Sequence, residues 1–254
     1  MAQKVLMIVG PTAVGKTTLS IKLAQKFNGQ VVSGDSMQVY QKLDIGTAKV
    51  TTEEMQGIPH YLLDEIPIDQ RFSVADFIDR TKKAISKIAA QDALPMLVGG
   101  TGFYLQSLID DFHFGNDQYQ DDHLRNQLHQ YAEEHGQQAL WDRLDQIDPV
   151  AAAKIPVTNE RRVIRALEVF EKTGKKFSVQ RDHANDTYDF LIIGLNTERA
   201  VLYERINHRV DLMVKDGVLD EARYLYENGG SKLPAGKGIG YKEFYPYFKH
   251  QASL

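Results

Sequence analysis

The sequence contains no cysteine among its 254 residues. This absence excludes disulfide bonds, zinc sites built on thiolates and a cysteine nucleophile, and it fits a reducing compartment. No apolar run approaches the roughly 18 residues that a membrane-spanning helix needs, and the N-terminus has no pattern typical of a signal peptide. We therefore expect a cytoplasmic protein that does not contact a membrane.

The chain also lacks a strong net charge, an internal repeat and a low-complexity tract. Its formal net charge is −4, which gives no overall indication of a nucleic-acid partner. The charges are unevenly placed, however: residues 110–148 hold ten acidic side chains and two basic ones, whereas residues 154–181 hold eight basic and three acidic ones. This asymmetry indicates a face that attracts an anion, although two solvated helices would give the same pattern.

The stretch GPTAVGKT, residues 10–17, is the most informative part of the chain. An apolar run at residues 5–9 precedes it, and apolar residues at helical spacing follow it from residue 19 to 27. A strand before the loop and a helix after it are the context that a phosphate-binding loop requires. An ordinary glycine-rich turn is the alternative, but it does not account for the complete spacing.

The residue types in this loop suit an anion. Gly10 and Gly15 allow backbone conformations in which successive N–H groups converge on phosphate oxygens at a helix N-terminus. Lys16 adds a positive charge, and the hydroxyl of Thr17 is placed to bind Mg²⁺. The loop alone does not indicate whether its phosphate is transferred or discarded.

Apolar runs alternate with helical patterns in the first 110 residues. Because such alternation is typical of parallel sheets, we expect an α/β fold, a P-loop NTPase-like doubly wound parallel sheet. Ser73 is expected to cap the longest of the early helices. Further strands are expected at residues 30–33, 60–66, 95–98 and 188–195, and further helices at 73–91, 103–108, 199–214 and 219–227.

Residues 112–182 show no convincing strand. Helical patterns occur there at residues 121–134, 138–147 and 159–173, and Gly174 is a typical helix stop. We therefore expect an all-helical insertion domain. It would occupy residues 112–184 within a catalytic core formed by residues 1–111 and 185–254.

Phosphate loops most often serve nucleotide hydrolysis or phosphoryl transfer. Those enzymes place an acidic residue after a later apolar strand to hold magnesium, but the run at residues 94–98 leads into Gly99, Gly100 and Thr101 instead. A motor or switch function is therefore disfavoured, while a small-molecule kinase remains open. The glycines and Thr101 form either a second place for a phosphate or a tight strand-to-helix turn.

Asp35 is the candidate general base. It follows the expected strand at residues 30–33, and ligands of open α/β sheets bind beyond the carboxyl ends of the strands. A carboxylate there could accept a proton from a nucleophile that becomes acidic in the transition state. A loop or helix-capping aspartate is the alternative. The isolated His60 and His113 are assigned no chemistry.

Several segments together resemble the bacterial tRNA dimethylallyltransferases, the tRNA isopentenyltransferase or IPP transferase family. They occur in the family's order and cover nearly the whole chain. In combination they are specific, whereas each alone would be weak. The segments are GPTAVGKT at 10–17, SGDSMQVYQKLDIGTAK at 33–49, GGTGFYL at 99–105, NERRVIRALEVFEKTGK at 159–175, LYERINHRVDLM at 202–213 and GIGYKE at 238–243.

This resemblance implies transfer of a dimethylallyl group from dimethylallyl diphosphate to the N6 amine of the adenosine 3′ of the anticodon, with Mg²⁺ as cofactor. It implies that Asp35, Thr101 and Lys16 are catalytic and that Thr17 binds the metal. Because a paired base could not enter the site, the adenine must be extruded. The implied diphosphate-binding residues are Gly10, Pro11, Thr12, Ala13, Val14, Gly15, Lys16, Thr17 and Arg209, and the implied tRNA-binding residues are Asp35, Ser36, Met37, Gln38, Glu160, Arg161, Arg162, Val163 and Ile164.

In the family, the helical region embraces the anticodon stem-loop, so the resemblance gives the basic run a role in phosphate and base contact. The chain departs from the family pattern at Gly34, Val50 and Phe103, away from the implied chemistry. Family members usually continue beyond the GIGYKE segment with a basic motif, whereas this chain stops at Leu254. We therefore expect weaker tRNA affinity than in a longer relative.

Three other functions remain open from the residues. An ATP-dependent small-molecule kinase would consume ATP when its acceptor is added. A prenyltransferase acting on free adenine nucleotides would not need the basic helical insertion. A binding module without catalysis would retain tRNA and form no product. We expect a monomer whose partners are the tRNA anticodon stem-loop and dimethylallyl diphosphate.

Overall fold

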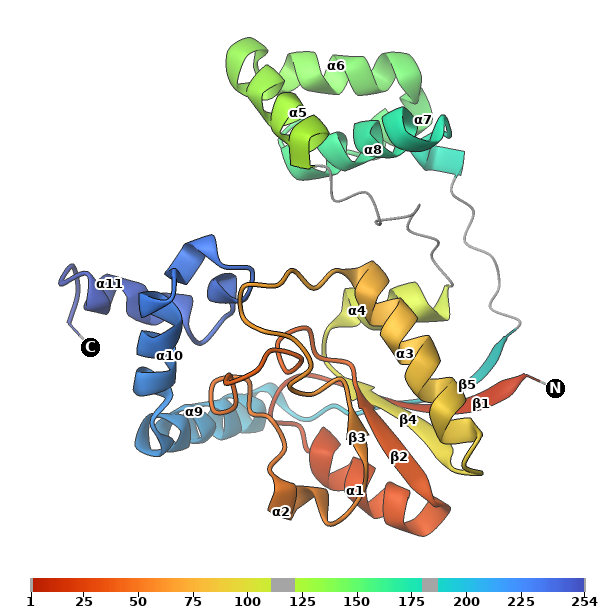
Figure 1. Ribbon diagram of the computed structural model, residues 1–254, viewed down its shortest axis with the longest axis vertical. Coiled ribbons are helices and arrows are strands. Elements are labelled where there is room, and N and C mark those ends of the chain that lie inside the picture. The colour runs from red at the N-terminus through yellow and green to blue at the C-terminus, as the bar shows by residue number, and fades with distance from the viewer. Residues whose placement is uncertain (1, 111–121, 180–186, 254) are drawn as a thin grey trace. The chain divides into compact units, whose positions relative to one another are not determined.

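The computed structural model describes residues 2–110, 122–179 and 187–253, and the chain divides into two compact units. One unit comprises Met1–Ile109 and Asn185–Leu254, and the other comprises Asp110–Ala184. The boundaries expected from sequence, after residues 111 and 184, lie outside the described residues. The interruption of one unit by the other is the arrangement of a core with an inserted domain (Figure 1).

The core unit contains a five-stranded sheet in the order β3-β2-β4-β1-β5, and every pair of neighbouring strands is parallel. The register places Val9 of β1 beside Gly99 of β4 and Gly194 of β5. The carboxyl ends of these strands therefore meet along one edge of the sheet. The strands are β1 (Gln3–Val9), β2 (Gly29–Ser33), β3 (His60–Tyr61), β4 (Leu94–Gly99) and β5 (Tyr188–Gly194).

Helices cover both faces of the central strands. On one face, Leu6, Ile8 and Met96 form a buried cluster with Ala24 of α1 (Lys16–Phe27). Met7 alternates with them and points to the other face, yet it is also fully buried. The amphipathic helix α3 (Val74–Ala89) packs against β2 and β4. The expected P-loop-like α/β fold is confirmed, with its central strands buried and its edge strand β5 exposing Leu191 and Ile192.

One expected strand is much shorter than its apolar pattern indicates. Residues 60–66 were predicted to be extended, but β3 ends at Tyr61. Leu62 and Asp64 adopt left-handed conformations, with φ of 62° and 54°, which an extended strand cannot contain. Pairing resumes only as an isolated bridge between Tyr40 and Ile66.

Local capping explains where the long helices begin and end. Ser73 caps α3 as predicted: its side chain accepts from the N–H of Asp76, whose carboxylate accepts from the N–H of Ser73. Gly174 ends α8 (Glu160–Thr173) in the left-handed conformation, with φ of 66°, and its N–H donates to Phe170 O at 2.8 Å. The two end signals read from sequence are therefore confirmed.

The core unit continues after the sheet with α9 (Arg199–Asp216) and α10 (Val218–Glu227), separated by Gly217. Short 3₁₀ turns at residues 230–232, 235–237 and 242–244 lead to α11 (Tyr245–Phe248). Short helices that periodicity did not reveal include α2 (Thr52–Met55). Within the described ranges, no helix combines the length and apolarity required to cross a membrane.

The second unit is helical in its described part and has its own core. Leu140 and Leu144 of α6 pack with Val163, Ile164 and other apolar residues of α8. The indole of Trp141 donates to Ile155 O at 2.7 Å. The core unit also contains α4 (Gly102–Ile109). The other elements of the helical unit are α5 (Asp122–His135), α6 (Gln137–Ile147), α7 (Pro149–Ala152) and a 3₁₀ turn at 177–179.

Two glycines allow the loops after β2 and β4 to touch. A Cβ added at Gly99 would lie 2.4 Å from the backbone of Gly34, and one added at Gly34 would lie 2.8 Å from the Leu105 side chain. Distances below 3.0 Å require the backbone to move, because the contact at Gly99 is with main chain. The two strand ends can therefore approach this closely only through glycine.

We predict that Gly99→Ala lowers the free energy of unfolding by about 2 kcal/mol or more, because backbone must shift to admit the methyl group. Gly102→Ala is the matched control in the same loop, since its added Cβ meets nothing within 4 Å. Thermal denaturation measures both variants. Equal melting temperatures for Gly99→Ala and the parent chain would contradict the close approach.

Candidate active site

The phosphate-binding loop leaves β1 at Val9 and enters α1 at Lys16. Gly10 has φ of 152° and Gly15 has φ of 100°, and Ala13 between them is left-handed with φ of 60°. A Cβ at Gly10 would lie 2.5 Å from Leu195 O, so the loop start also depends on a glycine. These conformations turn the chain tightly and direct N–H groups toward the space before the α1 N-terminus.

The two cations expected at this loop lie beside it. Lys16 Nζ donates to Gly10 O at 2.9 Å and Pro11 O at 2.7 Å, and Arg209 Nη1 of α9 donates to Thr12 Oγ1 at 2.9 Å. Burial lowers the pKa of Lys16 and that of Arg209 below their usual values, and the charge of Asp35 opposes both shifts. An anion in the loop would restore the interactions that these partly buried cations have lost with water.

The loops after β2 and β4, which carry Asp35 and Thr101, contact each other. Asp35 Oδ1 accepts the Met37 N–H at 2.8 Å, which fixes the carboxylate in an Asx turn and leaves its second oxygen for other partners. Thr101 Oγ1 accepts the Ser36 N–H at 3.2 Å. The structure therefore joins the aspartate loop to the GGTG turn by direct contact.

The core unit thus gathers residues that are far apart in the sequence. The charge of Asp35 raises the pKa of Lys16 and that of Arg209, against the larger lowering by burial. Gly100 lies near the Lys16 ammonium, with an added Cβ only 3.8 Å from Nζ. Each group comes from a different strand end or from α9. The arrangement places a half-buried carboxylate next to a cationic anion-binding loop.

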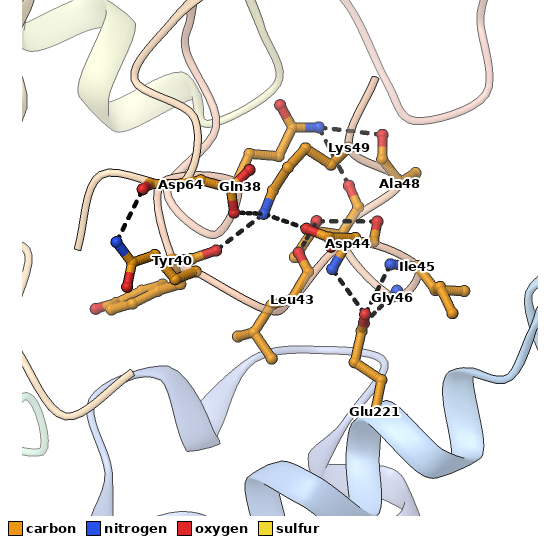
Figure 2. A network of polar contacts seen from close by, with 12 residues as sticks. Gln38, Tyr40, Leu43, Asp44, Ile45, Gly46, Ala48, Lys49, Asp64 and Glu221 are labelled. Carbon is orange, nitrogen blue, oxygen red and sulfur yellow. Dashed lines mark hydrogen bonds and ion pairs between the residues drawn. The ribbon is translucent and has the colours of Figure 1, made fainter. Parts of the chain in front are cut away.

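Gln38, expected to contact tRNA, has its side chain occupied within the protein. Its Nε2 donates to Thr47 O and Ala48 O, both at 3.2 Å, and its Oε1 accepts from Ser33 Oγ at 2.8 Å. The bonds to residues 47 and 48 tie the loop at residues 44–48 to Gln38 (Figure 2). The bond from Ser33 joins Gln38 to the end of β2. In this conformation the amide of Gln38 holds the neighbouring loop in place and does not bind a ligand.

Three further residues that the sequence left without a role surround the same loop. Lys49 and Glu221 contribute to the network of polar contacts in which Gln38 takes part (Figure 2). Tyr241 joins this network through its hydroxyl, which donates to Glu221. Lys49 and Tyr241 lie within the GTAK and GIGYKE segments, so the sequence could have singled them out. The sequence does not reveal that Glu221 connects the two segments, because residues 46, 221 and 241 are brought together only by the fold.

The predicted tRNA-binding residues of the insertion separate into two groups. Arg161 and Arg162 are exposed in the first turn of α8, as a contact with RNA requires. Val163 and Ile164 are only 1% and 2% exposed and belong to the core of the helical unit, so their side chains do not face solvent in this conformation. That these two positions contact tRNA stays a prediction. Helical periodicity turns positions 163 and 164 inward when 161 and 162 face solvent.

Glu160 is also engaged within its own unit. Its carboxylate accepts from Gln137 Nε2 at 3.0 Å and pairs with His129 Nδ1 at 2.7 Å. The bond from Gln137 and that from His129 lower the pKa of Glu160 below its usual value. The side chain therefore holds α5, α6 and α8 together, and a role in RNA contact would require it to give up these partners.

The residues present suit Mg²⁺ only in the presence of a phosphate ligand. Among the residues that the structure describes, no group of three His, Cys, Asp or Glu side chains could hold a metal ion by itself. Magnesium is commonly bound by one or two protein groups, with phosphate oxygens and water completing the octahedron. The exposed Thr17 hydroxyl in the first turn of α1 fits such a site.

The similarity of this chain to known proteins extends over almost its entire length. The family model described as IPP transferase matches residues 38–254. A tRNA dimethylallyltransferase of Ligilactobacillus salivarius is 57% identical over 100% of this chain and 83% of its own length.

Solved structures agree with these matches. The full-length tRNA isopentenylpyrophosphate transferase of Bacillus halodurans is 47% identical and superposes with a TM-score of 0.71, covering 99% of this chain and 79% of that one. A eukaryotic dimethylallyltransferase solved acting on tRNA is 34% identical with a TM-score of 0.86, covering 98% of this chain and 64% of that one. The phosphate loop, the parallel sheet and these similarities lead to one assignment: this chain belongs to the IPP transferase family.

Proposed function

We propose that this protein is a tRNA dimethylallyltransferase that moves the dimethylallyl group of dimethylallyl diphosphate to the N6 amine of the adenosine 3′ of the anticodon. The observation that carries the proposal is the contact of the Asp35 loop with the GGTG turn, where Ser36 N–H donates to Thr101 Oγ1. Gly100 of that turn lies near the Lys16 ammonium, and Arg209 bonds to the phosphate loop in the same unit. The reaction needs a cationic cradle for departing diphosphate and a base for the amine proton, and in this proposal these residues supply both.

The cradle stabilises the leaving group. The N–H groups of residues 10–17, the Lys16 ammonium and the Arg209 guanidinium oppose the negative charge that grows on diphosphate as the carbon–oxygen bond breaks. The Thr101 hydroxyl, on the neighbouring turn, completes the cradle. These groups are held by the protein before the substrate arrives, so little reorganisation is required during the reaction.

The acceptor side requires a proton acceptor. As the carbon–oxygen bond breaks, the first carbon of the dimethylallyl group gains cationic character and the N6 nitrogen of adenine forms the new carbon–nitrogen bond. The amine proton passes to the Asp35 carboxylate, and diphosphate leaves. The segment from Asp35 to Gln38 would receive the extruded base, with Gln38 acting through the loop it holds.

Magnesium would be held by the Thr17 hydroxyl together with the diphosphate oxygens. When bound, it neutralises charge on the leaving diphosphate. The P-loop itself is shared with ATP-dependent kinases, but β4 runs into Gly100 and Thr101 where those enzymes carry an acidic magnesium ligand. This difference favours prenyl transfer over phosphoryl transfer.

The helical unit supplies the RNA-binding surface in this proposal. Arg161 and Arg162 offer two exposed guanidinium groups at the start of α8, and guanidinium groups bind phosphate in a bidentate manner. A prenyltransferase acting on free nucleotides would have no use for this separate basic surface. The acceptor is therefore inferred to be the anticodon stem-loop.

The function is tested by incubating the protein with dimethylallyl diphosphate, Mg²⁺ and an unmodified tRNA that carries adenosine 3′ of its anticodon. Mass analysis of the digested nucleosides should show a dimethylallyl group on adenosine at that position. Adenosine monophosphate in place of tRNA tests the free-nucleotide alternative, and ATP with candidate acceptors tests the kinase. Unmodified adenosine in the tRNA would contradict the proposal.

We predict that Lys16→Ala weakens binding of Mg²⁺-pyrophosphate roughly tenfold or more, the loss expected for one hydrogen bond to a charged group. Because burial lowers the Lys16 pKa below 10.5, the ammonium loses its proton earlier than an exposed lysine as the pH rises. The affinity of the parent chain for Mg²⁺-pyrophosphate should therefore fall before the pH reaches 10.5. The Lys16→Ala variant should not show this fall. Calorimetric titration measures both, with exposed Lys22→Ala of α1 as control.

Asp35→Ala should reduce the turnover of prenyl transfer by about a hundredfold or more, because the amine proton loses its acceptor. Pyrophosphate affinity should remain nearly unchanged, since the loop and its cations stay in place. Asp69→Ala, which removes an exposed carboxylate of the same unit, is the control. Unchanged turnover in Asp35→Ala would remove Asp35 as the base.

Replacing both Arg161 and Arg162 with alanine should weaken tRNA binding and reduce its dependence on salt. If each guanidinium contacts one phosphate, the slope of log affinity against log salt should become less negative by about 1.4–1.8. The double variant Lys22→Ala/Lys26→Ala removes two exposed charges from α1 as a control. An identical slope in the arginine variant and the parent chain would contradict the proposed RNA surface.

A further inference from the structure

Two motifs without an assigned role, GTAK at residues 46–49 and GIGYKE at residues 238–243, touch in the core unit. Tyr241 is fully buried, and a Cβ added at Gly46 would lie 2.6 Å from its ring. Only glycine at position 46 therefore leaves room for this tyrosine. The Tyr241 hydroxyl donates to Glu221 Oε1 at 2.6 Å, which connects the pair to α10.

Glu221 binds the loop through three successive backbone N–H groups. Its Oε2 accepts from Asp44 N at 2.7 Å and Ile45 N at 3.0 Å, and its Oε1 accepts from Gly46 N at 2.9 Å. Successive N–H groups that converge on one anion form a backbone nest, and here the anion is a side chain of the same protein (Figure 2). Both carboxylate oxygens are used.

Lys49 fixes the same loop from the other side. Its Nζ, with the side chain only 5% exposed, donates to Tyr40 O at 2.9 Å and pairs with carboxylate oxygens of Asp44 and Asp64. Of residues 44–48, none has a buried side chain. Because little apolar burial holds this stretch, its conformation depends on these polar contacts.

The loop is connected to Asp35 by an unbroken series of hydrogen bonds. Gln38 Nε2 donates to Thr47 O and Ala48 O, and Gln38 Oε1 accepts from Ser33 Oγ. The same Ser33 oxygen accepts the Asp35 N–H at 3.3 Å. A displacement of residues 44–48 would therefore be transmitted through Gln38 to the backbone of the candidate base.

We propose that Glu221, supported by Tyr241, is a positioning residue for prenyl transfer: it holds residues 44–48 so that Gln38 and Asp35 keep the geometry in which the adenine amine is deprotonated. This inference rests on the proposed function of Asp35. Glu221 touches no reacting atom in it. Its effect on turnover passes entirely through the loop and Asp35, while the phosphate cradle of residues 10–17 is independent of it.

Hydrogen exchange of this chain tests the contact without an enzymatic assay. In Glu221→Gln the amides of residues 44–46 should exchange about tenfold faster or more, because the charged acceptor of three N–H groups is gone. Glu227→Gln is the matched control, since it makes the same substitution at an exposed position of α10. Unchanged exchange in Glu221→Gln would overturn the positioning role.

Kinetics then separate positioning from general stability. Glu221→Gln should lower kcat by about tenfold or more, with the KM for dimethylallyl diphosphate within twofold of the parent value. Glu221→Asp, which keeps the charge, should recover part of kcat. Tyr241→Phe, which removes one of four hydrogen bonds and keeps the ring, should have a smaller effect than Glu221→Gln.

A double-mutant cycle with Asp35→Ala distinguishes this inference from the proposed function. If Glu221 acts through Asp35, adding Glu221→Gln to Asp35→Ala should reduce kcat by less than twofold further. An equal reduction in both backgrounds would overturn the inference and leave Asp35 as the base. Unchanged turnover in Asp35→Ala would instead overturn the proposed function of that residue, and with it the positioning role of Glu221.

Discussion

The site depends on how closely the carboxyl ends of parallel strands can approach one another. Glycine makes this approach possible: Gly99 contacts the backbone of Gly34, and Gly10 lies against Leu195 O. With a side chain at any of these positions, the loops after β1, β2 and β4 would separate. The phosphate loop, the aspartate loop and the GGTG turn would then no longer share one edge of the sheet.

This crowding has an electrostatic consequence. Lys16 and Arg209 are partly removed from water, so the pKa of each is lowered by burial, and Asp35 partly offsets the cost. Cations held in this way bind an anion more strongly than solvated ones, because less water must be displaced. The same constraint that brings the strand ends together therefore prepares the site for a diphosphate.

The loop at residues 44–48 is held by hydrogen bonds to its backbone and not by close packing at glycines. Its backbone N–H groups need acceptors, and Glu221 and the Gln38 side chain meet the loop's N–H and C=O groups from two directions. The helices after β5 thus contribute to the site through Arg209, which reaches the phosphate loop, and through Glu221. They connect the leaving-group side of the proposed reaction with its acceptor side.

Elements whose signals lie within a few neighbouring residues could be predicted before the fold was known. Strand–loop–helix spacing identified the phosphate loop, Ser73 and Gly174 marked helix ends, and the absence of strand patterns identified the helical insertion. Contacts between distant parts of the chain account for what the sequence did not reveal: the early end of β3 after Tyr61 and the meeting of Gly46, Glu221 and Tyr241. Periodicity and motif spacing act over a few residues, whereas a carboxylate finds its backbone partners only after the chain has folded.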